Sequence, residues 1–68
     1  MNAKDAKKLA IESLEGLTEE GIDVADTTCV FLQPDGRYTV TDNGEKVADL
    51  DRENAIRIIV ENLTANND

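Results

Sequence analysis

The chain has no histidine and no tryptophan, and cysteine, proline, serine, phenylalanine and tyrosine each occur once. A single cysteine excludes a disulfide bond within the chain, and without histidine the familiar zinc ligand sets cannot be assembled. The usual nucleophile and base pairs of hydrolases cannot be built from these residues either. We therefore expect no metal site, no cofactor and no enzymatic activity, and we expect packing alone to hold the fold together.

Long apolar runs are absent as well. No stretch approaches the roughly 18 to 20 consecutive apolar residues of a membrane span, and no apolar run of signal-peptide type follows the N-terminal lysines. The sequence therefore predicts a cytoplasmic protein without a membrane partner. The chain is expected to form one domain, residues 1–68, with a frayed polar tail at 64–68, and it is too small to enclose a deep cleft between paired carboxylates.

What the chain has in excess is negative charge. Fifteen acidic residues against seven basic ones give a net charge of −8. This charge repels nucleic acid and acidic membranes and attracts basic partners, so direct nucleic-acid binding is not expected. Solubility is the alternative explanation, because acidic residues keep small proteins soluble and a salt-adapted source would show the same bias.

Apolar residues at helical spacing predict a helix at the start of the chain. Asn2 can cap its first turn. The helix ends at Gly16 or at Gly21, and Gly21 is favoured because Leu17 stays in phase with the apolar stripe. The charges of this helix oppose its dipole, since lysines occupy the first turns and glutamates the last.

Two turn sequences organise the middle of the chain. Pro34-Asp35-Gly36 favours a bulged hairpin turn, and Asn43-Gly44 is the strongest two-residue hairpin signal. The segments around these turns are rich in β-branched and aromatic residues, which is typical of strands. Three strands are therefore predicted, at 27–33, 37–42 and 45–50, after a polar connector at 23–26.

A second helix is predicted after the strands. Asp51 caps it, and its apolar face runs from Ala55 to Leu63. The order of elements is then αβββα, an α+β fold in which a three-stranded antiparallel meander has two helices packed on one face. An arrangement with one helix on each face of the sheet is the alternative.

The turns also predict the register of the sheet. The first turn pairs Phe31 with Thr39, and the second pairs Asp42 with Glu45 and hence Thr39 with Ala48. Side chains that alternate along the strands then form two faces. The core face is predicted to hold Val30, Leu32, Tyr38, Val40 and Val47, and the open face Cys29, Phe31, Arg37, Thr39, Thr41, Lys46 and Ala48.

The open face is one candidate binding surface, with Phe31, Arg37 and Thr39 as its binding residues. If both helices cover the other face, Phe31 and Cys29 lie exposed among threonines. Apolar patches with a polar rim often mark contact sites. One predicted function is therefore a homodimeric structural or interaction module that uses the open face around Phe31.

Acidic residues dominate the connector, the turns and the sheet edge. Residues 22–51 hold seven acidic and two basic residues, a net charge of −5. Carboxylates spaced along a surface can imitate a phosphate backbone for a protein whose basic residues bind nucleic acid. The predicted partner-binding acids are Asp23, Asp26, Asp35, Asp42, Glu45, Asp49 and Asp51.

In size and charge the chain resembles the small phage-encoded inhibitors, among them the anti-CRISPR proteins, several of which act as DNA mimics. The likeness rests on the seven acids and on the absence of histidine. It implies a non-enzymatic inhibitor that engages a basic, nucleic-acid-handling protein, which is the first predicted function. The helix-flanked meander is equally similar to many small α+β domains.

Overall fold

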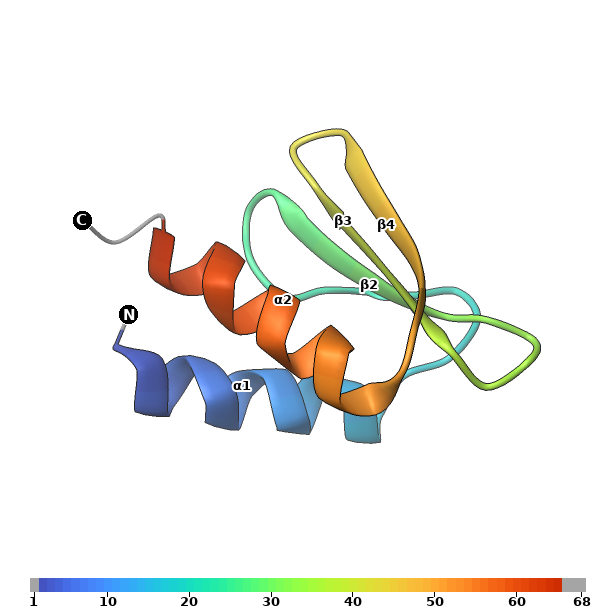
Figure 1. Cartoon of the computed structure of the whole chain (residues 1–68), viewed down its shortest axis with the longest axis horizontal. Coiled ribbons are helices and arrows are strands. Elements are labelled where there is room, and N and C mark those ends of the chain that lie inside the picture. Colours follow the sequence, from blue (N-terminus) through green and yellow to red (C-terminus); the bar gives the residue numbers. More distant parts are fainter. Residues whose placement is uncertain (1, 66–68) are drawn as a thin grey trace.

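The structure is a computed structural model that describes residues 2–65. Two helices flank a four-stranded antiparallel sheet in which each strand pairs with the next one along the chain (Figure 1). The α+β class is confirmed, whereas the predicted three-stranded meander lacked the edge strand β1. The elements are α1 (Ala3–Glu15), β1 (Ile22–Asp23), β2 (Thr28–Leu32), β3 (Tyr38–Asp42), β4 (Glu45–Leu50) and α2 (Arg52–Ala65).

Both helices begin at the side-chain caps that the sequence predicts. Asn2 Oδ1 accepts a hydrogen bond from the Asp5 amide at 2.8 Å, and Asp51 Oδ1 accepts one from the Asn54 amide at 2.8 Å. Such caps satisfy amides that have no partner within the helix. α2 includes residues 64 and 65 of the predicted polar tail, and residues 66–68 lie outside the described residues.

The end of α1 corrects the predicted boundary. The helix ends at Glu15 with Gly16 as its C-cap, and does not continue to Gly21. The Thr18 carbonyl accepts from the Gly21 amide at 3.0 Å and from the Leu32 amide at 3.4 Å. The chain therefore turns back toward β2 after α1, and Gly21 leads it into β1 with a φ of 81°.

The two hairpins have the register that their turns predict. Phe31 pairs with Thr39 across the first hairpin, and Asp42 pairs with Glu45 next to the second turn. Gly36 has a φ of 88°, as the bulged turn requires, and both Asn43 and Gly44 have the positive φ that a two-residue Asn-Gly turn requires, 52° and 89°. The turn chemistry thus fixes which side chains lie on the same face.

A bulge near the end of β4 interrupts the predicted pairing of Thr39 with Ala48. Asp49 has a φ of 60° at this point, a left-handed conformation that aspartate tolerates better than most residues. Because side chains alternate between faces along a strand, one extra residue moves Leu50 from the open face to the core face. Leu50 pairs there with Tyr38 and is 9% exposed.

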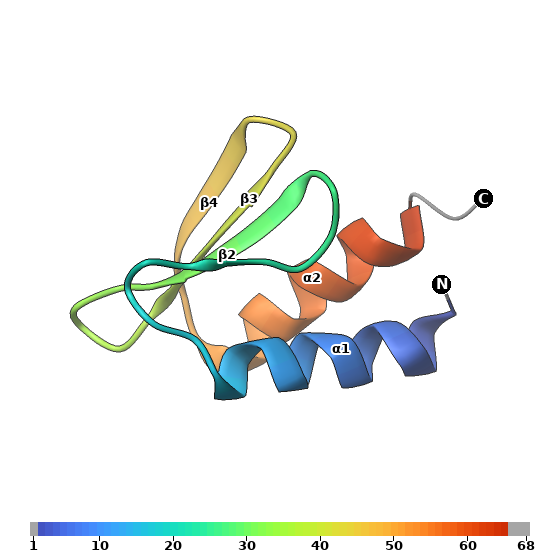
Figure 2. The ribbon, with the colours of Figure 1, turned by 180° about the vertical axis from the view of Figure 1, so that it is seen from behind.

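The core lies between the helices and one face of the sheet (Figures 1 and 2). α2 packs against β3 and β4, and α1 packs beside α2. Small residues on α1 allow the two helices to approach closely, and valines reach the core from the sheet. The buried apolar residues are Ala6, Ala10, Leu14, Val30, Val40, Leu50, Ala55, Ile59 and Leu63.

Several side chains differ from their predicted exposure, and of those placed on the open face Cys29 is half-buried and Thr39 is buried. Val47, which was predicted in the core, is 42% exposed, because α2 lies over β3 more than over β4. Phe31, which was predicted to be exposed, is half-buried because its ring lies against the backbone of Gly21. The chain leading into β1 therefore covers part of the predicted apolar patch.

Candidate functional site

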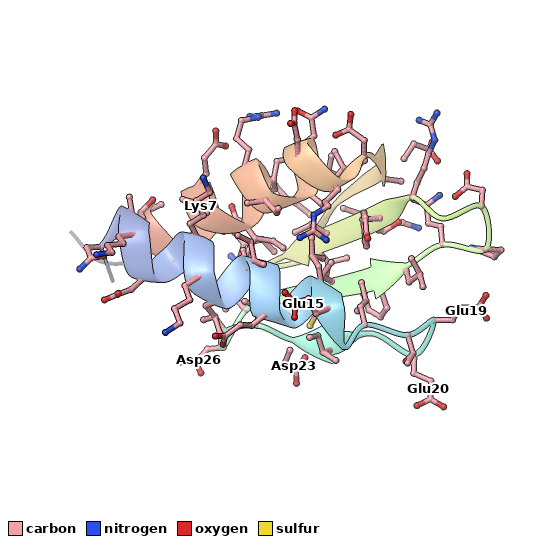
Figure 3. All side chains as sticks on the ribbon, turned by 90° about the horizontal axis from the view of Figure 1, so that it is seen from below. Lys7, Glu15, Glu19, Glu20, Asp23 and Asp26 are labelled. Atoms are coloured by element: carbon pink, nitrogen blue, oxygen red, sulfur yellow. The ribbon has the colours of Figure 1, made fainter. Side chains whose placement is uncertain are left out.

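Acidic side chains gather between α1 and β2, along the side of the sheet that β1 forms. Figure 3 shows them on one side of the molecule, with Glu15 of α1 nearby. The sequence has no lysine or arginine from residue 9 to residue 36, so this segment supplies no cation to neutralise them. Four exposed residues make up this surface, which we call the acidic edge: Glu19, Glu20, Asp23 and Asp26.

Two of the predicted partner-binding acids, Asp42 and Asp51, have structural roles. Asp42 Oδ1 accepts from the hydroxyls of Thr27 and Thr28 at 2.9 and 3.0 Å, which ties the β1–β2 connection to β3. Asp51 is the N-cap of α2. Glu45 is exposed beside the second hairpin turn and makes no side-chain hydrogen bond within the described residues.

Two more of these acids, Asp35 and Asp49, belong to a polar network around Gln33. Gln33 Oε1 accepts from the Asp49 amide at 2.7 Å and from the Thr39 hydroxyl at 2.8 Å. Gln33 Nε2 donates to Asp49 Oδ1 at 3.0 Å and to Asp35 Oδ1 at 3.4 Å. Arg37 Nη1 donates to the Asp49 carbonyl at 3.3 Å. The network holds the β4 bulge in place, and it includes two of the three residues predicted for open-face binding.

Cys29 faces the acidic edge. Its Sγ donates a hydrogen bond to Asp23 Oδ1 at 2.8 Å. This hydrogen bond, partial burial and the negative charge of Asp23 together raise the pKa of the Cys29 thiol above its ordinary value of 9.0, against a smaller opposing effect from Thr41. A thiol with a raised pKa is a weak nucleophile at neutral pH, so the arrangement does not activate Cys29.

Phe31 stands between two hollows on the open face of the sheet. Thr39 beside it is buried, at 7% exposed. Both hollows are shallow and mixed in polarity, and the one pair of a nucleophile and a carboxylate that they contain, Cys29 and Asp23, is the pair in which the carboxylate raises the pKa of the thiol. One, of about 330 Å³, is lined by Glu20, Gly21, Ile22, Asp23, Cys29 and Phe31, and the other, of about 300 Å³, by Phe31, Thr39, Thr41 and Lys46.

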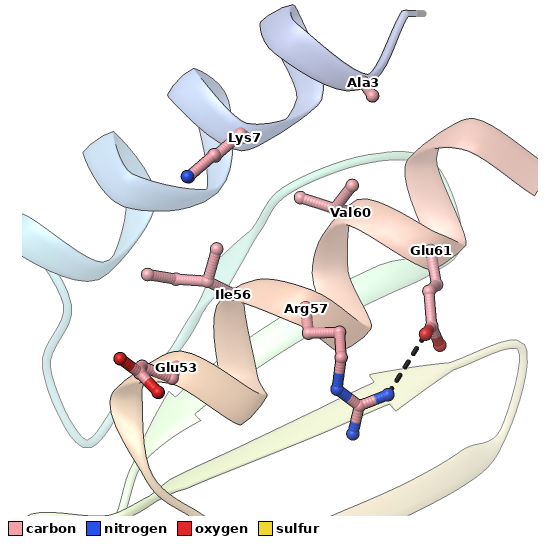
Figure 4. A pocket seen from close by; sticks show the side chains of 7 residues that line it. All are labelled: Ala3, Lys7, Glu53, Ile56, Arg57, Val60 and Glu61. Atoms are coloured by element: carbon pink, nitrogen blue, oxygen red, sulfur yellow. Dashed lines mark hydrogen bonds and ion pairs between the residues drawn. The ribbon is translucent and has the colours of Figure 1, made fainter.

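A further groove, of about 470 Å³, lies between α1 and α2 (Figure 4). Its apolar part comes from Ala3, Ile56 and Val60. On its rim Arg57 Nη1 contacts Glu61 Oε1 at 3.0 Å, and both side chains are largely exposed, so this ion pair adds little stability. The charged rim of this groove carries both signs of charge.

The structure separates the seven predicted acids instead of gathering them into one site. Only Asp23 and Asp26 belong to the acidic edge. Sequence reasoning listed Glu19 and Glu20 apart from these seven acids, as the acidic end of a helix extending to Gly21 that could itself serve recognition. The signal that could have found them is the long segment without a cation.

Within residues 2–65, no three histidine, cysteine, aspartate or glutamate side chains form a group that could hold a metal ion. No helix in that part of the chain is long and apolar enough to cross a membrane. A scan against protein-family models and searches of curated proteins and of solved structures found no match to the chain.

Proposed function

We propose that the chain is a small non-enzymatic binding protein that inhibits a basic, nucleic-acid-handling protein, and that the acidic edge is its contact surface. The observation that supports this function is the row of exposed carboxylates in a segment without a cation. Arginine and lysine side chains that bind a phosphate backbone can bind such carboxylates instead. In this respect the chain would act as a DNA mimic, as several anti-CRISPR proteins do.

The acidic edge suits this role better than four of the other predicted acids because its carboxylates are less involved in the fold, and unlike Glu45 its acids lie together. Glu19, Glu20 and Asp26 make no side-chain hydrogen bond within residues 2–65 and can therefore be replaced without disturbing internal contacts. Asp35, Asp42, Asp49 and Asp51 accept hydrogen bonds that hold turns, the bulge or a helix end.

The proposal is tested by competition with DNA. A partner captured on the immobilised chain at about 50 mM salt is loaded with a fluorescent DNA duplex, and the chain is then added. The edge variant carries Glu19→Gln, Glu20→Gln and Asp26→Asn. The control variant carries Glu45→Gln, Glu53→Gln and Glu61→Gln. Each variant loses three negative charges, so both have a net charge of −5 where the wild type has −8.

The wild type and the control variant should release the DNA at similar concentrations. The edge variant should need an at least about tenfold higher concentration, because the charges that contact the partner are gone. Equal potency of the two variants would mean that net charge, and not the acidic edge, drives binding.

A homodimeric module that uses the open sheet face is the second candidate function. The observation in its favour is the pair of hollows on either side of Phe31. Phe31→Ala and Thr41→Arg should both dissociate such a dimer, and Thr41→Arg leaves the Phe31 contact with Gly21 in place. Light scattering that gives the same molar mass for the wild type and for both variants would exclude this face as a dimer interface.

A further inference from the structure

The face of α1 that points away from α2 and from the sheet carries its charges in two blocks. Lys4 and Lys8 lie in the first half of the helix, Glu12 and Glu15 lie in the second half, and Ile11 lies between them. Residues 4, 8, 11 and 15 are four, three and four positions apart, so they form one stripe along the helix. Figure 3 views α1 from this side, with no other element in front of it.

Within one molecule this charge order is unfavourable. The N-terminal end of a helix favours anions and the C-terminal end favours cations. α1 has three lysines in its first half, and its last turn contains no basic residue. Lysine followed four residues later by glutamate is also the weaker orientation of such a pair. Stability of the isolated helix therefore does not explain these charges.

We infer that two copies of the chain associate through this face, with their α1 helices antiparallel. A two-fold axis across the middle of α1 places Lys4 of each copy beside Glu15 of the other and Lys8 beside Glu12. The axis then crosses α1 between residues 9 and 10, so the two Ile11 positions are offset by about 4 Å along the helices and their side chains can still contact each other. Each copy contributes the same patch, as an interface with two-fold symmetry requires. The antiparallel arrangement also sets the opposite ends of the two helix dipoles beside each other.

Charge identifies a second copy as the occupant of this face. The net charge of −8 makes most of the surface repel another copy, but around Ile11 three lysines lie beside two glutamates. The order of charges along α1 is complementary to the same order in an antiparallel copy. Binding of an unrelated acidic or basic partner would not require this symmetry. A shallow hollow of about 420 Å³ around Ile11 leaves room for the second Ile11, and it is lined by Lys4, Lys7, Lys8, Ile11, Glu12 and Glu15.

The length of α1 limits the strength of this dimer. A helix of 13 residues is roughly 20 Å long, and its outer face is smaller than the roughly 800 Å² that each partner buries in a stable complex. The ion pairs would also be partly exposed and screened by salt. We therefore expect a dissociation constant on the order of 0.1 to 1 mM that rises with salt.

Charge exchange on α1 tests the inference by sedimentation equilibrium at about 1 mM chain and low salt. The acidic-helix variant carries Lys4→Glu and Lys8→Glu, and the basic-helix variant carries Glu12→Lys and Glu15→Lys. The exchange variant carries all four changes and keeps the net charge of −8.

Each double variant alone should associate at least about tenfold more weakly than the wild type, because like charges then meet across the axis. Their equimolar mixture should form a heterodimer, and the exchange variant should dimerise as the wild type does.

The basic-helix variant distinguishes association through the α1 face from an effect of net charge alone. It changes two glutamates to lysines, so its net charge falls in magnitude from −8 to −4. If net charge alone governed association, this variant would dimerise more tightly than the wild type, and that result would overturn the inference. A monomeric wild type, a monomeric exchange variant, or loss of the dimer on Thr41→Arg would also overturn it. Circular dichroism checks that the variants keep α1. In the acidic-helix and exchange variants the helix should be favoured, because glutamates replace lysines near its N-terminus.

Discussion

Of the four glycines, Gly21 is the one at which an added methyl group would meet other atoms. Its φ is 81°, and a Cβ atom there would overlap the Phe31 ring. We expect Gly21→Ala to lower the free energy of unfolding by about 2 to 4 kcal/mol, through backbone strain and overlap together. Gly36→Ala is the matched control, because Gly36 has a φ of 88° but open space around it.

The control should cost only about 1 to 2 kcal/mol, since strain alone applies there. Urea unfolding followed by circular dichroism measures both variants. Equal costs would mean that the contact between Phe31 and Gly21 does not contribute to stability.

Asp23 controls the ionisation of Cys29. Because the folded state raises the pKa of the thiol, the hydrogen bond adds stability below the ordinary pKa of 9.0, and this stability is lost as the pH rises through the higher folded pKa. Asp23→Asn should lower the pKa of Cys29 and speed its alkylation by iodoacetamide at about pH 8 several-fold. An unchanged pH profile of the alkylation rate would contradict the role of this carboxylate.

At the scale of single elements, the β4 bulge depends on one amide side chain. Gln33→Glu keeps the shape but loses the donors to Asp35 and Asp49 and adds a third carboxylate between them. We expect a loss of about 1 to 2 kcal/mol in unfolding free energy at neutral pH. Gln33→Met loses the same donors without adding a charge and should cost less, and urea unfolding compares the two variants. Equal losses for both would show that the added charge is not the cause.

The start of α2 depends on Asp51 as a hydrogen-bond acceptor and not as a recognition charge. Asp51→Ala should reduce stability by about 1 kcal/mol, because the Asn54 amide loses its partner. Asp51→Ser removes the charge but keeps an acceptor, so it should restore most of the loss. Thermal unfolding of the two variants separates these roles, and equal melting temperatures would contradict the assignment of Asp51 as a cap.

The sequence predicts elements well where local chemistry decides them. Asn2 and Asp51 mark the helix starts, and the two glycine-containing turns determine the hairpin register. The end of α1 was missed because Leu17 stays in phase with the helix, while the Thr18 carbonyl bonds to Leu32, which is distant in sequence. β1 has two residues, too few for a pattern, and the β4 bulge depends on contacts with Gln33, which follows β2 and is distant in sequence.

For the whole molecule, the sequence predicts how much charge there is but not which charges are free to bind. The count of acids follows from composition. Asp42 and Asp49 hold connections together because the hydroxyls and the amide that they contact come from residues in and beside β2, distant in sequence. Glu19 and Glu20 are available because α1 ends before them. The segment without a cation points to these two acids, but that they lie outside the helix could be recognised only once the path of the chain was known.

The molecule combines two surfaces of different charge character. The acidic edge is purely negative, whereas the outer face of α1 carries both signs in a self-complementary order. A partner bound at the acidic edge and a second copy bound at α1 would use different residues. The two associations can therefore be abolished separately, by the edge variant and by either α1 double variant.

The dissociation constant of the partner complex, measured against salt concentration for the wild type, the edge variant and the control variant, tests the central claim most directly. We predict that the logarithm of the constant rises steeply with salt for the wild type and the control variant. For the edge variant we predict a constant at least about tenfold higher at low salt and a shallower slope. The same slope for all three proteins, or a wild-type constant that does not depend on salt, would contradict the account.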